Sequence, residues 1–369
     1  MTVDKIKYIN TLKGLGIIAV VLGHCGAPFT PVIYSYHMAL FFFITGYLYK
    51  DSYEKNFFTF ILKKLKSLYI PFLGFEICFV LLRNIFININ IYNSSQIAPI
   101  NSLTDWVNVF KQIITFNYTG DNLLSAIWFL KTLFFVNILF ITFNIISKKI
   151  FNNNEYIKFI CIIILTYIFF YALRYGYNPV TYFNPNNKKV LSVLLSIFDC
   201  RNFFLLSIYY FGSLYKKLER KIQLNIYISV FFTLFLIIVS KWRTIDVANY
   251  NFTSPHFFII CGLCGIYTNL YLAKKILLLK YNFLESLGKA SLYIMLLHFL
   301  AFKLVNLIFV IIYKLPLENI SAYPVLPINE YSWIIYTLFG VIIPLLLHKI
   351  FITLKNTNVI KINFGINLT

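Results

Sequence analysis

The chain has 369 residues, of which 59% are hydrophobic and only 12% are charged, and its mean hydropathy is +0.74. Because soluble domains carry about a quarter charged residues, this composition excludes an ordinary soluble protein and indicates an integral membrane protein. The net charge of +20 does not indicate nucleic-acid binding, because the Lys and Arg residues lie in short groups between apolar runs, as in loops beside an anionic membrane leaflet.

Apolar runs of about 20 residues, the length that spans a bilayer as a helix, recur along the whole chain. The predicted spans are 11–28, 32–49, 67–87, 122–146, 156–173, 190–214, 222–240, 256–273, 290–313 and 330–350. The sixth span is the least regular, because Asp199 and Arg201 lie near its middle. With no internal repeat and no separate soluble segment, we expect one all-α membrane domain over residues 1–369.

The distribution of basic residues predicts the orientation. If the N-terminus is cytoplasmic, 22 of the 33 Lys and Arg residues fall in cytoplasmic segments and 7 in outer ones. Positive charge concentrates in cytoplasmic loops, so the sequence predicts about ten transmembrane helices with both termini cytoplasmic. A cleaved signal peptide is disfavoured, because the next apolar run follows almost at once and His24 stands where cleavage needs a small residue. We expect a multi-pass protein of a bacterial inner or plasma membrane.

The first span contains "LKGLGIIAVVLGHCG" at residues 12–26, with a lysine and a histidine eleven residues apart. Eleven residues of α-helix make about three full turns and rise about 16 Å, so Lys13 and His24 share one face. Gly16 lies on the same stripe and allows another backbone or a slim ligand to approach. A histidine inside a membrane usually marks a pathway or a reactive centre, and neutral imidazole is a competent base near pH 7. We expect a functional His24; the alternative is a structural hydrogen bond.

The second span begins with "YSYHMALFFFITGYLYK" and follows a short turn that contains Pro28 and Pro31. The first two spans are therefore expected to be antiparallel neighbours, which places His37 at a depth similar to that of His24. The two histidines form a candidate proton-handling pair. The alternative for His37 is a polar contact between packed helices.

The six cysteines predict neither a disulfide framework nor a metal site, since most of them lie inside apolar runs. "CGLC", with Cys261 and Cys264, has the spacing of a redox or metal motif, but no further soft ligands gather near it in the sequence. Ordinary packing is the better interpretation.

Five stretches together resemble a known family. They are "LKGLGIIAVVLGH", "HMALFFFITGYLYK", "KKLKSLYIPF" before the third span, "WFLKTLFF" in the fourth and "LGKASLYIMLLH" leading into the ninth. They are similar to the membrane acyltransferase-3 family, whose signature in the first helix is a basic residue, ten intervening residues and a histidine. The resemblance covers the whole chain in outline.

The resemblance implies a reaction. The family transfers acyl groups, usually acetyl from cytoplasmic acetyl-CoA, to sugar hydroxyls of surface polysaccharides, lipid-linked glycans or peptidoglycan. Acetyl-CoA, or another acyl-CoA, is then a co-substrate rather than a bound cofactor, and the partners are the acyl-CoA, the glycan acceptor and the lipid bilayer.

The resemblance also implies roles for residues. His24 acts as general base with His37 beside it. Lysines on the donor side bind phosphate as point charges; these are Lys13, Lys63, Lys64 and Lys66. His298 matches a family position, as catalytic support or as a helix-packing residue. Apart from the resemblance, Trp128 is a possible site-lining residue through its indole N–H, with interfacial anchoring as the alternative, and Gly16 is another from its place on the stripe of Lys13 and His24. Two departures stand out: Lys13 occupies a position that is often arginine, and Ser67 stands where the basic motif commonly ends in arginine.

A secondary transporter or glycan exporter is the alternative function, which ten spans and intramembrane charges also suit. Such proteins carry paired broken helices in corresponding halves, and this sequence shows none. A membrane sensor or scaffold leaves Lys13 and His24 unexplained.

Overall fold

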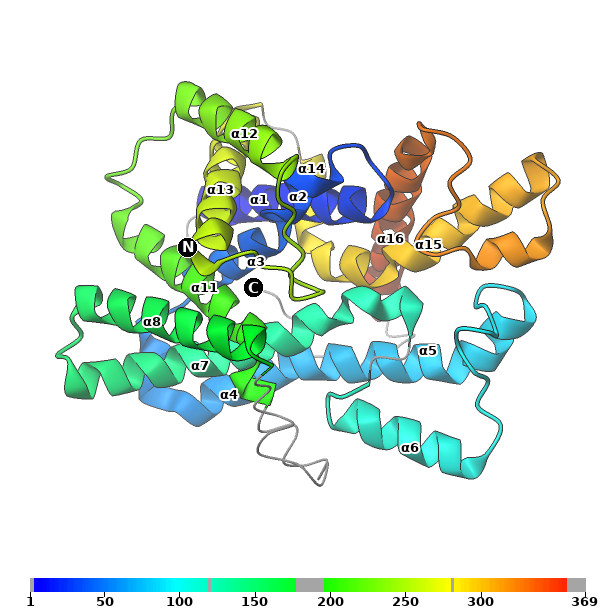
Figure 1. The fold of residues 1–369 in the computed structure, drawn as a ribbon, viewed down its shortest axis with the longest axis horizontal. Coiled ribbons are helices and arrows are strands. Elements are labelled where there is room, and N and C mark those ends of the chain that lie inside the picture. Colours follow the sequence, from blue (N-terminus) through cyan, green and yellow to red (C-terminus); the bar gives the residue numbers. More distant parts are fainter. Residues whose placement is uncertain (1–2, 119–120, 177–195, 280–281, 357–369) are drawn as a thin grey trace. The chain divides into compact units, whose positions relative to one another are not determined.

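The computed structural model describes residues 3–118, 121–176, 196–279 and 282–356. These ranges are predominantly helical, and within them the strand-like pairing is limited to one isolated antiparallel bridge between Asp246 and Asn251. The predicted all-α class is confirmed. The described chain divides into two compact units, each assembled from segments far apart in the sequence, as the colours of Figure 1 allow the reader to follow.

Unit 1 consists of Met1–Thr30, Ile70–Trp128 and Lys280–Thr369. Its elements are α1 (Val3–His24), α5 (Ile70–Asn88), α6 (Leu103–Ile114), η3 (Asn122–Ile127), α14 (Phe283–Lys289), α15 (Ser291–Ile312), η5 (Leu317–Ser321) and α16 (Ser332–Asn356). Helix α1 packs on α14, α15 and α16, and α15 also packs on η3 and η5. The first helix of the chain is therefore held by helices from its last quarter.

Unit 2 consists of Pro31–Tyr69 and Phe129–Leu279. Its elements are α2 (Thr30–Tyr34), α3 (His37–Tyr47), η1 (Asp51–Asn56), α4 (Phe57–Lys64), the π-helical turn η2 (Leu65–Tyr69), α7 (Trp128–Ile150), α8 (Glu155–Arg174), η4 (Ser196–Phe198), α11 (Cys200–Leu218), α12 (Ile226–Ser240) and α13 (Pro255–Leu278). Helix α11 lies at its centre, packing on α3, α8 and α13.

Glycines set the closest helix crossing in unit 1. A Cβ atom added to Gly14 on α1 would lie 2.2 Å from the backbone oxygen of Leu284, and one added to Gly288 on α14 would lie 1.8 Å from that of Asn10. Small residues at facing positions let two helix backbones approach within a membrane. Gly16, two residues further along α1, is buried, and the close approach predicted there stays a prediction.

Seven helices among the described residues are long and apolar enough to cross a membrane: Val3–His24, Asp51–Asn88, Asn122–Ile150, Glu155–Arg174, Pro255–Leu278, Ser291–Ile312 and Ser332–Leu354. The predicted count of about ten is therefore not confirmed. In the second predicted span, α3 has 11 residues, and in the seventh α12 has 15. At 1.5 Å per residue these helices are about 16 Å and 22 Å long, shorter than a hydrocarbon core of about 30 Å.

The irregular sixth predicted span does not form one continuous helix across the charged pair. Residues 190–195 lie outside the described residues, and Asp199 precedes α11 as its N-cap, accepting a hydrogen bond from the backbone N–H of Arg201. The guanidinium of Arg201 lies 4.2 Å from the ring centre of Tyr250, whose hydroxyl donates to Asp199. The charges that made this span irregular therefore mark a helix start.

Helix α8 shows how these helices meet lipid. Ile160, Ile164 and Ile168 follow one another at a spacing of four residues and are 53%, 51% and 55% exposed. Residues four apart share one helix face, so these side chains form an apolar exposed stripe. A stripe of this kind is stable against hydrocarbon and costly in water. The chain is a multi-pass membrane protein.

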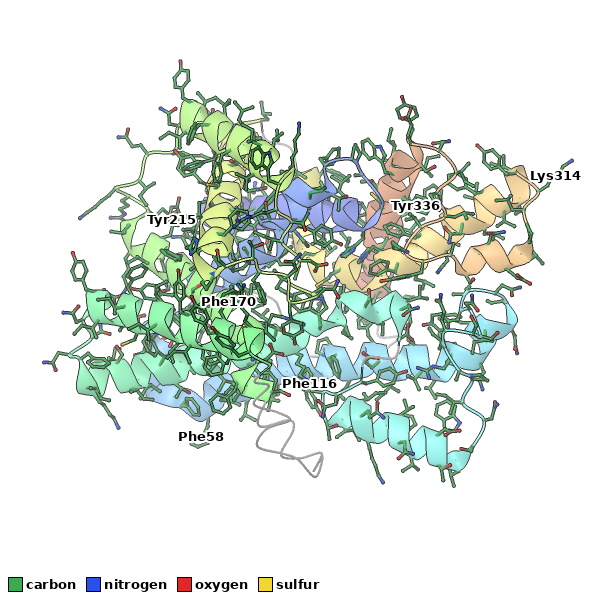
Figure 2. The ribbon with its side chains drawn as sticks, in the orientation of Figure 1. Phe58, Phe116, Phe170, Tyr215, Lys314 and Tyr336 are labelled. Carbon is green, nitrogen blue, oxygen red and sulfur yellow. The ribbon has the colours of Figure 1, made fainter. Side chains whose placement is uncertain are left out.

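The core of unit 1 contains one fully buried tyrosine with both hydrogen-bonding roles satisfied. The ring of Tyr336 on α16, labelled in Figure 2, lies 5.3 Å from that of Phe302 and 5.8 Å from that of Phe309, both on α15. Its hydroxyl donates to Asn306 Oδ1 at 2.5 Å and accepts from the backbone N–H of Leu326 at 2.9 Å. These contacts fix α15, and with it His298, against α16.

Candidate functional site

Helix α1 carries both residues of the first-span motif. It runs without a break from Val3 to His24, so Lys13 lies in its middle and His24 is its last residue. Both side chains are partly buried. The predicted arrangement, a lysine and a histidine on one helix separated by about 16 Å of axial rise, is therefore compatible with the fold.

A second histidine lies against His24. The imidazole of His298, on α15, stacks on that of His24 with ring centres 5.3 Å apart and an angle of 26° between the ring planes. Phe299 contacts both histidines, with its ring centre 5.0 Å from that of His24 and 4.0 Å from that of His298. Unit 1 thus brings the first-span histidine and the ninth-span histidine into one pair.

The backbone fixes the proton on His298. Its Nδ1 lies 3.1 Å from the carbonyl oxygen of Ile294 and 2.8 Å from that of Met295. Carbonyl oxygens only accept hydrogen bonds, so Nδ1 carries the hydrogen and, in the neutral ring, Nε2 carries a lone pair. His298 is fully buried and Nε2 has no hydrogen-bond partner among the described residues. The pair therefore contains a buried nitrogen, His298 Nε2, whose lone pair can accept a hydrogen bond.

The wall beside the histidine pair comes from η3 and from the loop that follows η5. The hydroxyl of Ser125 on η3 lies 2.6 Å from that of Tyr323, and the ring of Tyr323 lies 5.2 Å from that of Phe299. Trp128 directly follows η3 and is partly buried. Trp128 is therefore placed next to an element that packs on the helix of His298.

His37 belongs to unit 2, where it begins α3 and is buried. Its Nδ1 lies 2.9 Å from the carbonyl oxygen of Ile33, and its ring meets that of Tyr34 edge-on at 5.1 Å. His24 belongs to unit 1, so the predicted pair of His24 and His37 stays a prediction. The partner that unit 1 supplies to His24 is His298.

The lysines predicted to bind the donor lie at a change of helix type in unit 2. Lys63 and Lys64 end α4, and Lys66 lies in the π-helical turn η2. The ammonium of Lys63 lies 5.8 Å from the ring centre of Tyr53 and that of Lys64 lies 5.2 Å from that of Phe60, distances typical of cation–π contacts. Lys63 and Lys66 are exposed, so both can meet an anion from solution.

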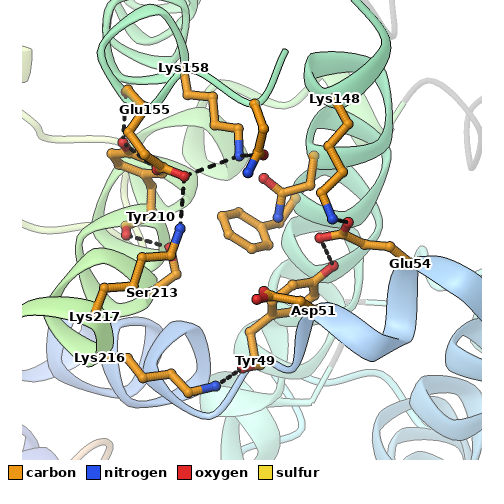
Figure 3. Close-up of a pocket in the computed structure, with 13 residues that line it drawn as sticks. Tyr49, Asp51, Glu54, Lys148, Glu155, Lys158, Tyr210, Ser213, Lys216 and Lys217 are labelled. Atoms are coloured by element: carbon orange, nitrogen blue, oxygen red, sulfur yellow. Dashed lines mark hydrogen bonds and ion pairs between the residues drawn. The ribbon is translucent and has the colours of Figure 1, made fainter. Parts of the chain in front are cut away.

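Unit 2 also contains a pocket that the sequence did not single out (Figure 3). Its volume is about 200 Å³, and it is lined by Tyr49, Asp51, Glu54, Phe140, Asn144, Lys148, Asn153, Glu155, Lys158, Tyr210, Ser213, Lys216 and Lys217. The predicted orientation puts the basic members of this set on the cytoplasmic side. The sequence analysis used those lysines only to orient the chain, which is why the pocket was missed.

The charges in this pocket are largely paired with one another. Lys217 binds Glu155 at 2.7 Å, Lys158 binds the same carboxylate at 3.3 Å, and Lys148 binds Glu54. The ring of Tyr49 lies 5.8 Å from that of Tyr53 and 6.1 Å from that of Phe60, the two rings beneath Lys63 and Lys64. The pocket and the predicted donor lysines therefore share one aromatic wall.

Comparison with known proteins identifies the chain over nearly its whole length. A family model described as an acyltransferase domain, Acyl_transf_3, matches residues 6–352. No curated protein and no solved structure matches the chain. Among the described residues there is no group of three or more His, Cys, Asp or Glu side chains arranged to hold a metal ion.

Proposed function

The chain belongs to the acyltransferase-3 family, and we propose that it moves an acetyl group from cytoplasmic acetyl-CoA to a sugar hydroxyl of a surface or lipid-linked glycan. The observation that best supports this reaction is the stacked pair of His24 and His298, with the lone pair of His298 Nε2 unused. Attack of an alcohol on a thioester needs a base for the hydroxyl proton, and neutral imidazole is such a base at neutral pH.

We assign the first proton transfer to His24. The hydroxyl oxygen attacks the thioester carbonyl, its proton moves to His24, and the C–S bond breaks. The proton then passes to the departing thiolate, which leaves as CoA thiol, so the histidine returns to its neutral form. A covalent acyl-histidine intermediate is the other route through the same side chain.

His298 acts through His24 in this mechanism. A protonated imidazole has two N–H donors, one more than the neutral ring. The lone pair of His298 Nε2, buried beside His24, accepts the additional N–H after a small rotation of the ring. Hydrogen bonds to a charged group are stronger than neutral ones, above all in a buried site, so His298 stabilises the charged state of His24.

The donor lies on the cytoplasmic side in this proposal. Lys13, Lys63, Lys64 and Lys66 supply positive charge for its phosphates, and Trp128 and Gly16 line the path of its acyl end. The support is the exposure of Lys63 and Lys66 and the burial of Gly16. His37 keeps the predicted role of a second proton-handling group.

The test is transfer of isotopically labelled acetyl from acetyl-CoA into the surface-glycan fraction of membranes that contain the protein. We compare the intact protein with His24→Asn at equal membrane levels. Label that appears only with intact His24 supports the reaction and its base. Equal label in both samples removes His24 from the mechanism, and absence of label in both removes acetyl-CoA or the glycan as substrate.

A further inference from the structure

Unit 1 contains a buried polar cluster that the proposed chemistry does not use. It consists of Glu76 and Arg83 on α5, Tyr92 and Tyr118 from the segment that follows α5, and Asp121, the N-cap of η3. Each of these side chains is less than a tenth exposed. Glu76 and Arg83 are seven residues apart and so lie on one face of α5. Glu76 lies inside the third predicted span, 67–87, where a charged side chain needs a partner.

The contacts within the cluster satisfy only part of it. The hydroxyl of Tyr92 donates to Asp121 Oδ1, which also accepts the backbone N–H of Leu123 at 3.0 Å. The guanidinium of Arg83 lies 5.5 Å from the ring centre of Tyr118. The charges of Glu76, Arg83 and Asp121 are close enough to interact with one another.

Five polar atoms of the cluster have no hydrogen-bond partner among the described residues. Ten buried side-chain N and O atoms lack a hydrogen bond among the described residues, and five of them are in this cluster: Glu76 Oε2, Arg83 Nε, Arg83 Nη2, Tyr118 Oη and Asp121 Oδ2. An unpaired buried polar atom costs free energy, and natural proteins keep few of them. Their concentration in one place indicates a polar site where water or a ligand supplies the missing partners.

The chemistry of the five atoms defines the ligand class. The two nitrogens of Arg83 donate, the oxygens of Glu76 and Asp121 accept, and a phenol does both. An anion meets two carboxylates and a cation meets a guanidinium, so neither fits the whole cluster. Hydroxyl groups donate and accept at once, which makes a neutral ligand with several hydroxyls the complement.

The cluster is connected to the histidine pair through contacts within unit 1. Asp121 begins η3, which packs on α15. Along that contact Ser125 binds Tyr323, and the ring of Tyr323 lies 5.2 Å from that of Phe299, which touches both His24 and His298. In the predicted orientation α5 runs outward, so Arg83 and Asp121 lie toward the outer side, where a surface glycan is met.

We propose that Glu76, Arg83, Tyr118 and Asp121 form the binding site for the sugar acceptor, with the bound hydroxyls completing the five unpaired atoms. This inference rests on the proposed function. It deepens that function by assigning the acceptor a site on α5 and η3, apart from the histidines that carry the proton.

The experiment measures half-saturation by each substrate with purified protein in detergent, labelled acetyl-CoA and a surface-glycan fraction extracted from the producing cells and quantified as hexose. Glu76→Gln keeps the shape of the side chain and removes its charge, and Arg83→Lys keeps the charge and removes the planar fork. Glu318→Gln, an exposed carboxylate of the same unit, is the matched control. Thermal unfolding of each variant is measured alongside.

We expect Glu76→Gln and Arg83→Lys to raise half-saturation by the glycan at least tenfold and to leave half-saturation by acetyl-CoA unchanged, with no change in Glu318→Gln. Unchanged glycan half-saturation in both variants overturns the inference while the proposed function stands. Equal weakening of both substrates, or loss of the folded protein in both variants, makes the cluster structural and also overturns it. Absence of transfer by the intact protein overturns the proposed function instead.

Discussion

His24 and His298 are more than 270 residues apart in the chain, yet their imidazole rings stack with centres 5.3 Å apart. The α1–α15 contact makes this pair, and the carbonyl oxygens of Ile294 and Met295 hold the hydrogen of His298 on Nδ1. In the proposed mechanism His24 meets the substrate, and His298 works through His24.

The proposed mechanism makes the two histidines one unit, so we expect their effects on rate not to be additive. We expect His24→Asn to lower acetyl transfer by at least about 100-fold, the low end for general base catalysis. His298→Asn keeps a nitrogen that can donate to the backbone but removes Nε2, and lowers transfer by about 10- to 100-fold, the value of one hydrogen bond to a charged group. The double variant is expected to match His24→Asn alone. A double variant slower by the product of the two effects makes His298 an independent base.

The glycine crossing in unit 1 leaves no room for a side chain. We expect Gly14→Ala and Gly288→Ala to destabilise the protein by about 1–3 kcal/mol or more, because each added Cβ meets backbone oxygen rather than a side chain that can move. Thermal unfolding in detergent measures the change. Gly262→Ala in unit 2 is the control, since its Cβ would lie 3.2 Å from Ala39 Cβ and 3.4 Å from Ile208 Cδ1, contacts that need only small shifts. Equal thermal unfolding midpoints for all three variants contradict the close approach of the two helix backbones at Gly14 and Gly288.

A buried lysine holds the loop that carries Tyr323. Lys303 on α15 donates to the backbone oxygens of Ser321 at 2.9 Å and Ala322 at 2.7 Å. We expect Lys303→Met to lower stability by about 1–3 kcal/mol, since those oxygens lose a charged donor, and to lower transfer by releasing Tyr323 from Phe299. Lys314→Met, at an exposed position labelled in Figure 2, leaves both quantities unchanged. Unchanged acetyl transfer in Lys303→Met shows that the position of the loop carrying Tyr323 does not affect activity.

The proposed donor lysines are exposed and so screened by salt. At low ionic strength we expect the double variant Lys63→Gln, Lys66→Gln to raise half-saturation by acetyl-CoA about two- to fivefold, the range of exposed ion pairs. At about 1 M salt, where the Debye length is about 3 Å, the difference from the intact protein disappears. Lys111→Gln, an exposed lysine on the predicted outer side, is the control. A salt-independent effect, or none at all, removes these lysines from donor binding.

Asp121 makes stability depend on pH. Burial raises the pKa of Asp121, against the opposing effects of its hydrogen bonds from Tyr92 and Leu123 and of the charge of Arg83. The folded state therefore binds this proton more tightly than the unfolded state. The resulting stability is complete below the ordinary pKa of aspartic acid, and it is lost as pH rises through the raised pKa of the folded state. We expect Asp121→Asn to remove this dependence from unfolding midpoints measured across acidic pH. The same slope in both proteins assigns it to other groups.

Composition and spacing predicted much of this molecule. The all-α class follows from the apolar runs, and the first-span motif lies on one unbroken helix, because the residues between Lys13 and His24 form one long apolar run. The number of membrane-spanning helices could not be predicted from the sequence in the same way. A run of apolar letters does not show that α3 starts only at His37, or that Asp199 starts α11 instead of lying inside a helix.

The parts of the site that the sequence missed depend on contacts between distant segments. His298 matched the family pattern, but its partnership with His24 depends on the α1–α15 contact. Arg83 and Asp121 are ordinary charged residues in the sequence; only packing reveals that both are buried and incompletely hydrogen-bonded. Whether a side chain is buried and fully hydrogen-bonded depends on its folded surroundings. The spacing of residues in the sequence does not show it.

Because α1 packs on α14, α15 and α16, the surroundings of the first helix are completed only late in synthesis. At about 5–20 residues per second, a ribosome finishes α1 tens of seconds before it reaches Ser291. Throughout that interval the membrane holds Lys13 and His24 without the helices that later enclose them. A nascent or truncated chain that stops before α15 lacks His298, so the histidine pair is assembled only after most of the chain has been translated. Insertion of the last helices, rather than of the first, is the step that completes the histidine pair.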